Sequence, residues 1–217
     1  MDDRDPAALG GSRALVAVLA GGRGRRIGGA KPTRALAGRP LIDYPLAAAR
    51  AANLEVVVVA KRDDELPAEL AVPTVIEPEE PRHPLCGVLA ALEHAAREAP
   101  ETAVVLVGCD MPFLAPSLLR SLADAHRGAV LIEISGRAQP LPSRCLPEHA
   151  GLLRDSLAKQ APLGEALRSL GPEIIDERVL SRFGDARRLF LSVDRPEDLQ
   201  SAERLLTPPR AVPPPAG

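Results

Sequence analysis

The sequence predicts an α/β fold built on a mostly parallel, doubly wound sheet. Short apolar runs alternate along the chain with segments of helical pattern, which is typical of strands and helices alternating around a parallel sheet. The strongest runs are apolar throughout, as strands are when helices cover both faces of the sheet. The chain has 217 residues, enough for such a domain with a substantial core. We therefore expect a three-layer, Rossmann-like arrangement.

The apolar runs define the expected strands. The segments "ALVAVLA", "EVVVVA" and "TAVVLVG" are the strongest, and "PTVIE" is weaker. Their β-branched and aliphatic residues favour strands. The expected strands span 14–20, 55–60, 73–77, 102–108, 129–135 and 189–193.

Segments of helical pattern lie between these strands. Apolar residues recur three or four positions apart in 84–99, whose C-terminal half is polar. Pro45 stands early in 41–52, so the start of that helix stays open. The tails 1–13 and 207–217 are expected to be disordered, which leaves 14–206 as a single domain. The expected helices span 41–52, 84–99, 115–126, 148–159 and 195–206.

Composition and charge narrow the classes of function. The formal net charge of −2 argues against a general nucleic-acid binder, which is normally basic. No apolar run approaches the ~20 residues of a membrane span, and the acidic N-terminus lacks the apolar region of a secretory signal. We therefore expect a cytoplasmic protein without a membrane anchor. The three cysteines are widely spaced and the four histidines stand apart, which argues against a disulfide framework and a zinc site.

The stretch "LAGGRGRRIGGAKP", residues 19–32, follows the first expected strand and combines five glycines with three arginines and a lysine. Glycine amides approach phosphate oxygens closely because no Cβ intervenes, so the stretch indicates a phosphate-binding loop. A Walker A loop does not fit, because Lys31 is followed by Pro32 rather than by serine or threonine. A long basic loop suits a triphosphate, with Arg26 and Lys31 placing positive charge near the β- and γ-phosphates. An exposed, arginine-rich flexible loop is the bland alternative.

A dinucleotide-binding loop is the alternative from another class of function. Lys61 and Arg62 follow the next expected strand, where a 2′-phosphate would lie in an NADP-dependent enzyme. Such a loop opens directly into a helix, however, and the density of glycine and proline over 28–40 opposes an immediate helix. The loosened G-x-G-x-x-x-G pattern that raises this alternative comprises Gly22, Gly24 and Gly28.

The loop resembles the signature L-A-G-G-x-S-x-R-M-G-x-D-K of the MobA-like nucleotidyltransferases, whose best-known members are molybdenum cofactor guanylyltransferases. The segment "GRPLI", residues 38–42, falls where the family has G-x-P-L-I. Serine, methionine and aspartate of the signature are replaced by Gly24, Ile27 and Ala30. The resemblance implies a sheet of the nucleotide-diphospho-sugar transferase type. It also implies that the loop binds the nucleotide through Leu19, Ala20, Gly21, Gly22 and Lys31.

Two aspartates are candidate metal ligands. Asp110 ends the strongest expected strand in "VVLVGCDMPFL", where a carboxylate can hold Mg²⁺ or cap the following turn. By itself the sequence is equally compatible with both interpretations, but Asp110 matches the aspartate of the family's metal motif C-D-x-P-[FY], which also lies at the nucleotide. "LFLSVDRPEDL" resembles the family segment F-x-N-V-N-T-P-E-D-L, and Asp194 would complete the metal site there. Alternatively, Asp194 and Glu197 form a capping box.

Two further segments concern the substrates. "HPLCG", residues 83–87, resembles the family's G-P-L-A-G, which implies that Pro84, Leu85 and Gly87 contact the nucleotide; a plain helix start is the alternative. Gly87 is costly inside a helix and asks for a reason, such as the close approach of a ligand. Cys86 is interpreted as a packing residue. "GRAQPLPSRC", residues 136–145, lies where relatives meet the acceptor, and its Arg137, Gln139 and Arg144 either contact an acceptor phosphate or are solvated.

The resemblance implies nucleotidyl transfer. A terminal phosphate of the acceptor would attack the α-phosphorus of Mg-NTP in line, with Arg26, Lys31 and Asp110 as catalytic residues. "LAGG" goes with GTP in this family and "LAAG" with CTP, so the implied substrates are GTP and molybdenum-bound molybdopterin. Transient contact with other enzymes that make or use this cofactor is implied as well. The alternatives are CTP, another phosphorylated acceptor such as a sugar phosphate or phospholactate, and a nucleotide-binding module without turnover.

Overall fold

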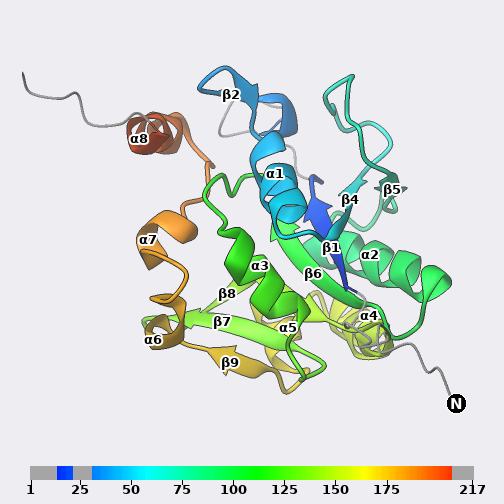
Figure 1. The fold of residues 1–217 in the computed structure, drawn as a ribbon. Helices are drawn as coiled ribbons and strands as arrows, with labels where there is room; N and C mark the ends of the chain where they lie inside the picture. The colour runs from blue at the N-terminus through cyan, green and yellow to red at the C-terminus, as the bar shows by residue number, and fades with distance from the viewer. Residues whose placement is uncertain (1–13, 22–30, 207–217) are drawn as a thin grey trace, which may run out of the picture.

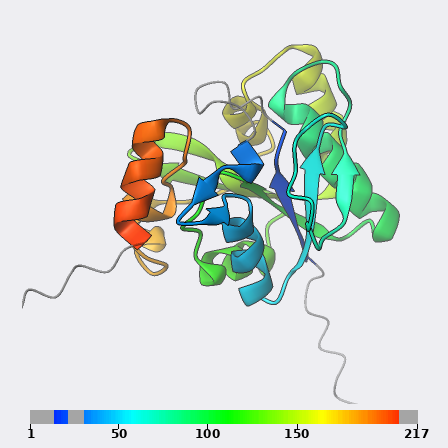
Figure 2. The ribbon, with the colours of Figure 1, turned by 90° about the horizontal axis from the view of Figure 1, so that it is seen from above.

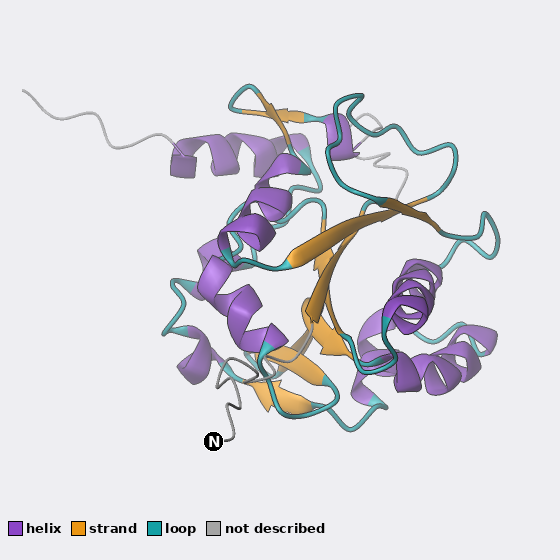
Figure 3. Ribbon diagram, turned by 45° about the vertical axis from the view of Figure 1, so that its right-hand side comes forward, coloured by secondary structure: helices purple, strands orange, loops and turns teal. Residues whose placement is uncertain are grey.

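The computed structural model of the protein describes residues 14–21 and 31–206. Helices lie on both sides of a central sheet (Figures 1 and 3). The strands are β1 (Ala14–Leu19), β2 (Ala35–Leu36), β3 (Arg39–Pro40), β4 (Glu55–Ala60), β5 (Thr74–Ile76), β6 (Ala103–Gly108), β7 (Val130–Ile134), β8 (Arg137–Cys145) and β9 (Glu173–Ile175). The α-helices are α1 (Asp43–Ala51), α2 (Pro84–Glu98), α3 (Pro116–Ala123), α4 (Ala150–Ala158), α5 (Leu163–Arg168), α6 (Glu177–Leu180), α7 (Ala186–Leu189) and α8 (Pro196–Leu206). Two 3-10 turns are η2 (Lys31–Thr33) and η3 (Pro147–His149).

In the described part of the chain, seven strands form the main sheet in the order β5-β4-β1-β6-β8-β7-β9. The first four run parallel, and β8 runs antiparallel to both of its neighbours. The predicted mostly parallel sheet is therefore confirmed. The chain moves from β1 to β4 and β5 on one side and then crosses to β6 on the other. Ligands of such sheets bind beyond the carboxyl ends of the strands at this reversal of strand order.

Each face of the sheet packs a separate apolar core. Val16 and Val18 of β1 face the layer formed by α1 and α3, whereas Leu15 and Ala17 face α2, α4 and α5. This alternation follows from the two-residue period of a strand. It explains why β1 and β6 are apolar throughout, because every side chain meets one helical layer or the other.

A smaller apolar cluster joins α8 to the β2–β3 hairpin. Leu36, Leu41, Val193 and Ala202 are buried in it. Figure 2 shows α8 beside this hairpin at the edge of the molecule. The cluster anchors the chain after Lys31 and on both sides of Asp194, which are two predicted site residues.

The strand predicted at 189–193 is wrong. Residues 186–189 form α7, whose first turn is capped by the Asp185 carboxylate, which accepts from the Arg188 amide at 2.9 Å. Phe190 to Val193 then run without a strand partner in the described structure. Val193 is fully buried in the α8 cluster, so its apolar character reflects packing between elements rather than a place in the sheet.

Strand β8 was not predicted, because its prolines and polar residues lack a strand pattern. Pro140 and Pro142 lie where the pairing of β7 with β8 shifts register, between Gln139 and Arg144. A proline is tolerated at such a bulge because no ladder hydrogen bond is required of it there. The expected strands 14–20, 55–60, 73–77, 102–108 and 129–135 and all five expected helices are present, with ends shifted by up to three residues.

Three predicted segments cannot be compared with the structure. The predicted tails 1–13 and 207–217 and the loop residues 22–30 lie outside the described residues. In the described part, no helix combines the length and hydrophobicity needed to cross a bilayer.

Candidate nucleotide and metal site

A cavity of about 410 Å³ opens beyond the carboxyl ends of β1, β4, β5 and β6. This volume lies within the range of small-molecule sites. The residues that follow the four strands all reach it, which is the expected consequence of the strand order. Its lining includes Leu19, Ala20, Gly21, Lys31, Lys61, Asp64, Glu77, Pro84, Gly87, Gly108 and Asp110.

Lys31 connects the two predicted metal ligands. Its ammonium nitrogen lies 2.6 Å from Asp110 Oδ2 and also donates to Asp194 Oδ1. The Lys31 and Asp110 side chains are 16 % and 18 % exposed, whereas Asp194 is 50 % exposed. Burial alone would lower the pKa of Lys31, but the two carboxylates outweigh it, so the pKa is raised and the side chain stays cationic. Residues 79 and 163 positions apart in sequence thus meet at one point.

Asp110 is held in place by its surroundings at the end of β6. Its carbonyl accepts from the Val193 amide at 2.9 Å, which ties the segment before α8 to the sheet. A Cβ on Gly108 would lie 2.5 Å from Asp110 Oδ1, a separation that real Cβ atoms do not show. Glycine at position 108 therefore makes room for the carboxylate.

The turn before α8 sets the position of Asp194. The Asp198 carboxylate, in the first turn of α8, accepts from the Asp194 and Arg195 amides at 3.0 and 2.8 Å. The Asp194 side chain faces Lys31 and receives a hydrogen bond from Ser192 Oγ at 3.1 Å. The turn that Asp198 stabilises presents the Asp194 carboxylate to Lys31.

The donor set at this point fits a magnesium ion that also binds phosphate. One cationic nitrogen already lies between oxygens of Asp110 and Asp194, so the two carboxylates are spaced to share a single cation. Within the described ranges, no group of three or more histidine, cysteine or acidic side chains gathers as a metal site. Mg²⁺ commonly takes only one or two carboxylates and completes its octahedron with water and substrate phosphates.

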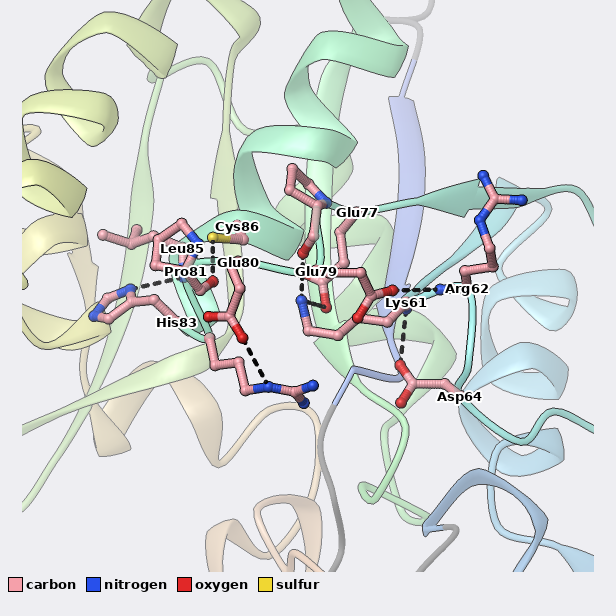
Figure 4. A network of polar contacts seen from close by, with 12 residues as sticks. Lys61, Arg62, Asp64, Glu77, Glu79, Glu80, Pro81, His83, Leu85 and Cys86 are labelled. Carbon is pink, nitrogen blue, oxygen red and sulfur yellow. Dashed lines mark hydrogen bonds and ion pairs between the residues drawn. The ribbon is translucent and has the colours of Figure 1, made fainter.

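A second charged group lies at the β4–β5 end of the cavity, and the sequence did not predict it. Glu77 follows β5 and is 6 % exposed. Burial raises the pKa of this carboxyl, and Lys61, whose Nζ lies 3.6 Å from Oε1, opposes the shift. Lys61 also donates to the Pro78 carbonyl, and its amide donates to Asp64 Oδ2 at 2.8 Å (Figure 4).

The predicted nucleotide motif at the start of α2 is only partly at the cavity. Pro84 occupies the first turn and lines the cavity together with Gly87. Leu85, in contrast, is fully buried in the core, so its side chain does not face the cavity. His83 caps the helix by accepting from the Leu85 amide at 3.2 Å. Cys86 is buried and donates to the Pro81 carbonyl, in agreement with a packing role.

Arg144 does not lie on the surface and does not face an acceptor. It is 3 % exposed and donates to the carbonyls of Arg127 and Gly128, the latter at 2.9 Å. Arg144 therefore links strand β8 to the loop that precedes β7 through two hydrogen bonds. Arg137 is exposed and Gln139 half-buried on the same strand. Two other predicted residues, Gly22 and Arg26, lie outside the described residues.

Comparison with known proteins identifies the family of this chain. Residues 16–173 match the family model described as a MobA-like NTP transferase domain. The chain belongs to this family. It is therefore a nucleotidyltransferase, as the loop after β1 and the aspartate after β6 predicted, and the alternatives of an NADP-dependent enzyme and of a module without turnover are set aside.

The curated relatives of this NTP transferase match it over most of its length. A molybdenum cofactor guanylyltransferase of Cereibacter sphaeroides is 35 % identical over 195 residues, covering 87 % of this chain and 95 % of the relative. A protein of the same name from Pseudomonas putida strain KT2440 is 33 % identical over 185 residues, covering 80 % and 94 % of the two chains.

Solved structures share the fold of this NTP transferase. Molybdopterin-guanine dinucleotide biosynthesis protein A from Archaeoglobus fulgidus superposes with a TM-score of 0.72 at 24 % identity, covering 88 % of this chain and 97 % of that one. The 2-C-methyl-D-erythritol 4-phosphate cytidylyltransferase of Thermus thermophilus gives a TM-score of 0.62 at 20 % identity, covering 89 % and 98 %. The predicted sheet of the nucleotide-diphospho-sugar transferase type is thereby confirmed.

Proposed function

We propose that the protein transfers GMP from Mg-GTP to the terminal phosphate of molybdenum-bound molybdopterin. Pyrophosphate leaves, and a guanine dinucleotide form of the cofactor is the product. The names of relatives that match at 33–35 % identity over most of the chain support this choice of nucleotide and acceptor. The observation that carries the chemistry is the convergence of Lys31, Asp110 and Asp194 at the strand reversal.

The reaction requires positioning and charge rather than a protein nucleophile. An acceptor phosphate oxygen forms the new bond to the α-phosphorus, while the bond from that phosphorus to the departing β-phosphate oxygen breaks. Asp110 and Asp194 would hold Mg²⁺, which supplies positive charge to the phosphate oxygens. Lys31, released from the two carboxylates when the metal binds, donates hydrogen bonds to the leaving pyrophosphate. Arg26 adds charge from the loop after β1.

Backbone segments with small side chains, after β1 and at the start of α2, position the nucleotide. Ala20 and Gly21 follow β1, and the Ala20 amide donates to the Val59 carbonyl at 2.8 Å, which fixes the path of the chain at the mouth of the cavity. Leu19, Ala20 and Gly21 on one side and Pro84 and Gly87 on the other frame the base.

Pyrophosphate release tests this proposal. Purified protein with Mg²⁺, GTP and molybdenum-bound molybdopterin is expected to release pyrophosphate and to form the guanine dinucleotide in equal amounts. ATP, CTP and UTP are the matched controls, and each is expected to give much slower release. Release from none of the four nucleotides, with the acceptor present, would refute the proposal; release from CTP alone would reassign the nucleotide.

A further inference from the structure

Asp64 is a half-buried acidic residue in the wall of the cavity, on a different element from the proposed metal ligands. It ends a tight turn after β4: its amide donates to the Lys61 carbonyl at 3.2 Å, and its Oδ2 accepts from the Lys61 amide at 2.8 Å (Figure 4). The turn therefore fixes the direction of the side chain. Among the described residues, no hydrogen bond or ion pair engages Oδ1. One oxygen of this carboxylate is thus available to a ligand in the cavity.

The Asp64 carboxylate lies between the two ends of the cavity. Strand β4 stands between β5 and β1 in the sheet, and β6 lies on the other side of β1. A Cβ on Gly21 would lie 3.8 Å from Asp64 Oδ2, an ordinary contact distance, so the carboxylate borders the segment after β1. Burial is the main cause that raises the pKa values of Glu77 and Cys109, and the charge of Asp64 adds to both shifts. Asp64 is therefore close to Glu77 on one side and to Cys109, the neighbour of Asp110, on the other.

The group of the nucleotide that meets Asp64 has to be a hydrogen-bond donor. A carboxylate repels phosphate oxygens, and the phosphates have their cationic partner in Lys31 at the end of the cavity near β6. Two strand spacings of about 4.8 Å separate β4 from β6, roughly 10 Å in all. In a nucleoside triphosphate the ribose follows the α-phosphate, and its 2′- and 3′-hydroxyls are donors a few bonds from the α-phosphorus. A nucleotide whose phosphates lie at Lys31 and Asp110 therefore brings its ribose to the turn after β4.

We propose that Asp64 binds the ribose of the nucleotide, with Oδ1 accepting hydrogen bonds from the ribose hydroxyls. This inference rests on the nucleotide site of the proposed function and deepens it. An acidic side chain beyond the end of a strand also binds a ribose hydroxyl in dinucleotide-binding sheets. A nucleotide without these hydroxyls takes water away from Oδ1 and supplies no donor in its place, so it is expected to bind more weakly.

Titration calorimetry of nucleotide binding, with Mg²⁺ and without acceptor, tests this contact without turnover. The wild-type enzyme is expected to bind GTP about 10- to 100-fold more tightly than 2′,3′-dideoxy-GTP, the range for one hydrogen bond to a charged group. Asp64→Asn keeps an oxygen for the Lys61 amide but replaces the free carboxylate oxygen with an NH₂ group. This variant is expected to bring the ratio of the two dissociation constants close to one. The ratio is the deciding quantity, because a change in the charge of the cavity affects both nucleotides alike.

Asp63→Asn is the matched control, because Asp63 is the exposed neighbour in sequence, carries the same charge and does not line the cavity. This variant is expected to keep the wild-type ratio. Thermal unfolding shows whether each variant is folded, and the wild-type ratio needs no variant at all. Equal binding of the two nucleotides by the wild-type enzyme, or a folded Asp64→Asn that keeps the preference for GTP, overturns the inference while leaving the proposed function intact. A wild-type enzyme that shows the expected ratio but releases no pyrophosphate with the acceptor present refutes the proposed function and supports the ribose contact.

Discussion

Replacing Lys31 with methionine is expected to strengthen divalent-metal binding while it impairs catalysis. The ammonium of Lys31 lies between Asp110 and Asp194, where the proposed Mg²⁺ has to bind. In the wild-type enzyme a metal ion must displace this ammonium from both carboxylates. Methionine has a similar length and no charge, so in the variant the two carboxylates repel each other until a cation enters.

The size of the effect follows from the separation of the two carboxylates. Both contacting oxygens lie within 2.6 Å of the same nitrogen, so they are no more than about 5 Å apart. Their repulsion at that distance is about 1 kcal/mol in water and about 3 kcal/mol at an effective dielectric constant of about 20. Asp194 is half exposed, which favours the lower part of this range. We expect metal affinity without nucleotide to rise by about tenfold, which corresponds to about 1.4 kcal/mol.

Electron paramagnetic resonance of free Mn²⁺ measures this affinity without nucleotide or turnover. The Mn²⁺ dissociation constant of Lys31→Met is expected to fall about tenfold, while pyrophosphate release from GTP falls by at least about 100-fold because the positive charge that stabilises the leaving pyrophosphate is lost. Lys159→Met removes an exposed lysine just after α4 and is expected to change neither quantity. If Lys31→Met binds Mn²⁺ as weakly as the wild type, or more weakly, then the ammonium does not compete with the metal and the reasoning fails.

Three further predictions concern packing, thiols and pH. Gly108→Ala places a Cβ 2.5 Å from Asp110 Oδ1 and is expected to lower kcat at least about tenfold and the free energy of unfolding by about 1–3 kcal/mol. Gly151 has open space around it, so Gly151→Ala is the control and is expected to lower neither quantity. Equal activity of the two variants would contradict this prediction. All three cysteines are buried, and burial raises the pKa of Cys145 to about 12. A thiol reagent at about pH 8 is therefore expected to react slowly with the native enzyme, whereas in urea it should modify all three thiols. A thiol that reacts rapidly in the native enzyme would disprove this prediction. Burial lowers the pKa of His149, so the unfolded state is protonated before the folded state as the pH falls, and the free energy of unfolding should decrease below about pH 6.5. His149→Gln is expected to lose less stability as the pH falls below that value. Identical denaturation profiles of the two proteins would rule this out.

The architecture could be predicted where burial alone sets the sequence pattern. Strand β4 was predicted with its observed ends, because "EVVVVA" has helices on both faces and a turn on either side. The pattern misled where apolar residues are buried outside the sheet, as Val193 is beneath α8. It also missed β8, whose buried Arg144 and prolines are accommodated by hydrogen bonds to a loop and by a register shift. Neither compensation leaves a local signal in the sequence.

The sequence predicts the end of the cavity that holds Lys31 and Asp110, but not the end that holds Glu77 and Lys61. Asp110 ends a strong strand and Lys31 ends a glycine-rich loop, so the topology alone brings both to one edge of the sheet. The place of Asp194 depended on the resemblance, because its sequence context fits a helix cap equally well. Glu77 is the last residue of an expected strand, and the strand pattern alone does not mark it as a site residue. An acid directly after a weak strand, with unexplained glycines at 21 and 87, was the available signal.

The glycines of the two nucleotide motifs acquire a physical reason that differs from the predicted one. The sequence suggested that they let a ligand approach the backbone, but in the structure Gly21 and Gly87 make room for an oxygen of Glu77, as Gly108 does for Asp110. At both ends of the cavity, a carboxylate occupies space that a neighbouring glycine leaves open because it has no Cβ. Alanine at any of these positions therefore displaces a carboxylate before it meets a substrate. If that is the cause of their effect, Gly108→Ala should lower turnover even when Mg-GTP saturates the enzyme, because its Cβ displaces the Asp110 carboxylate.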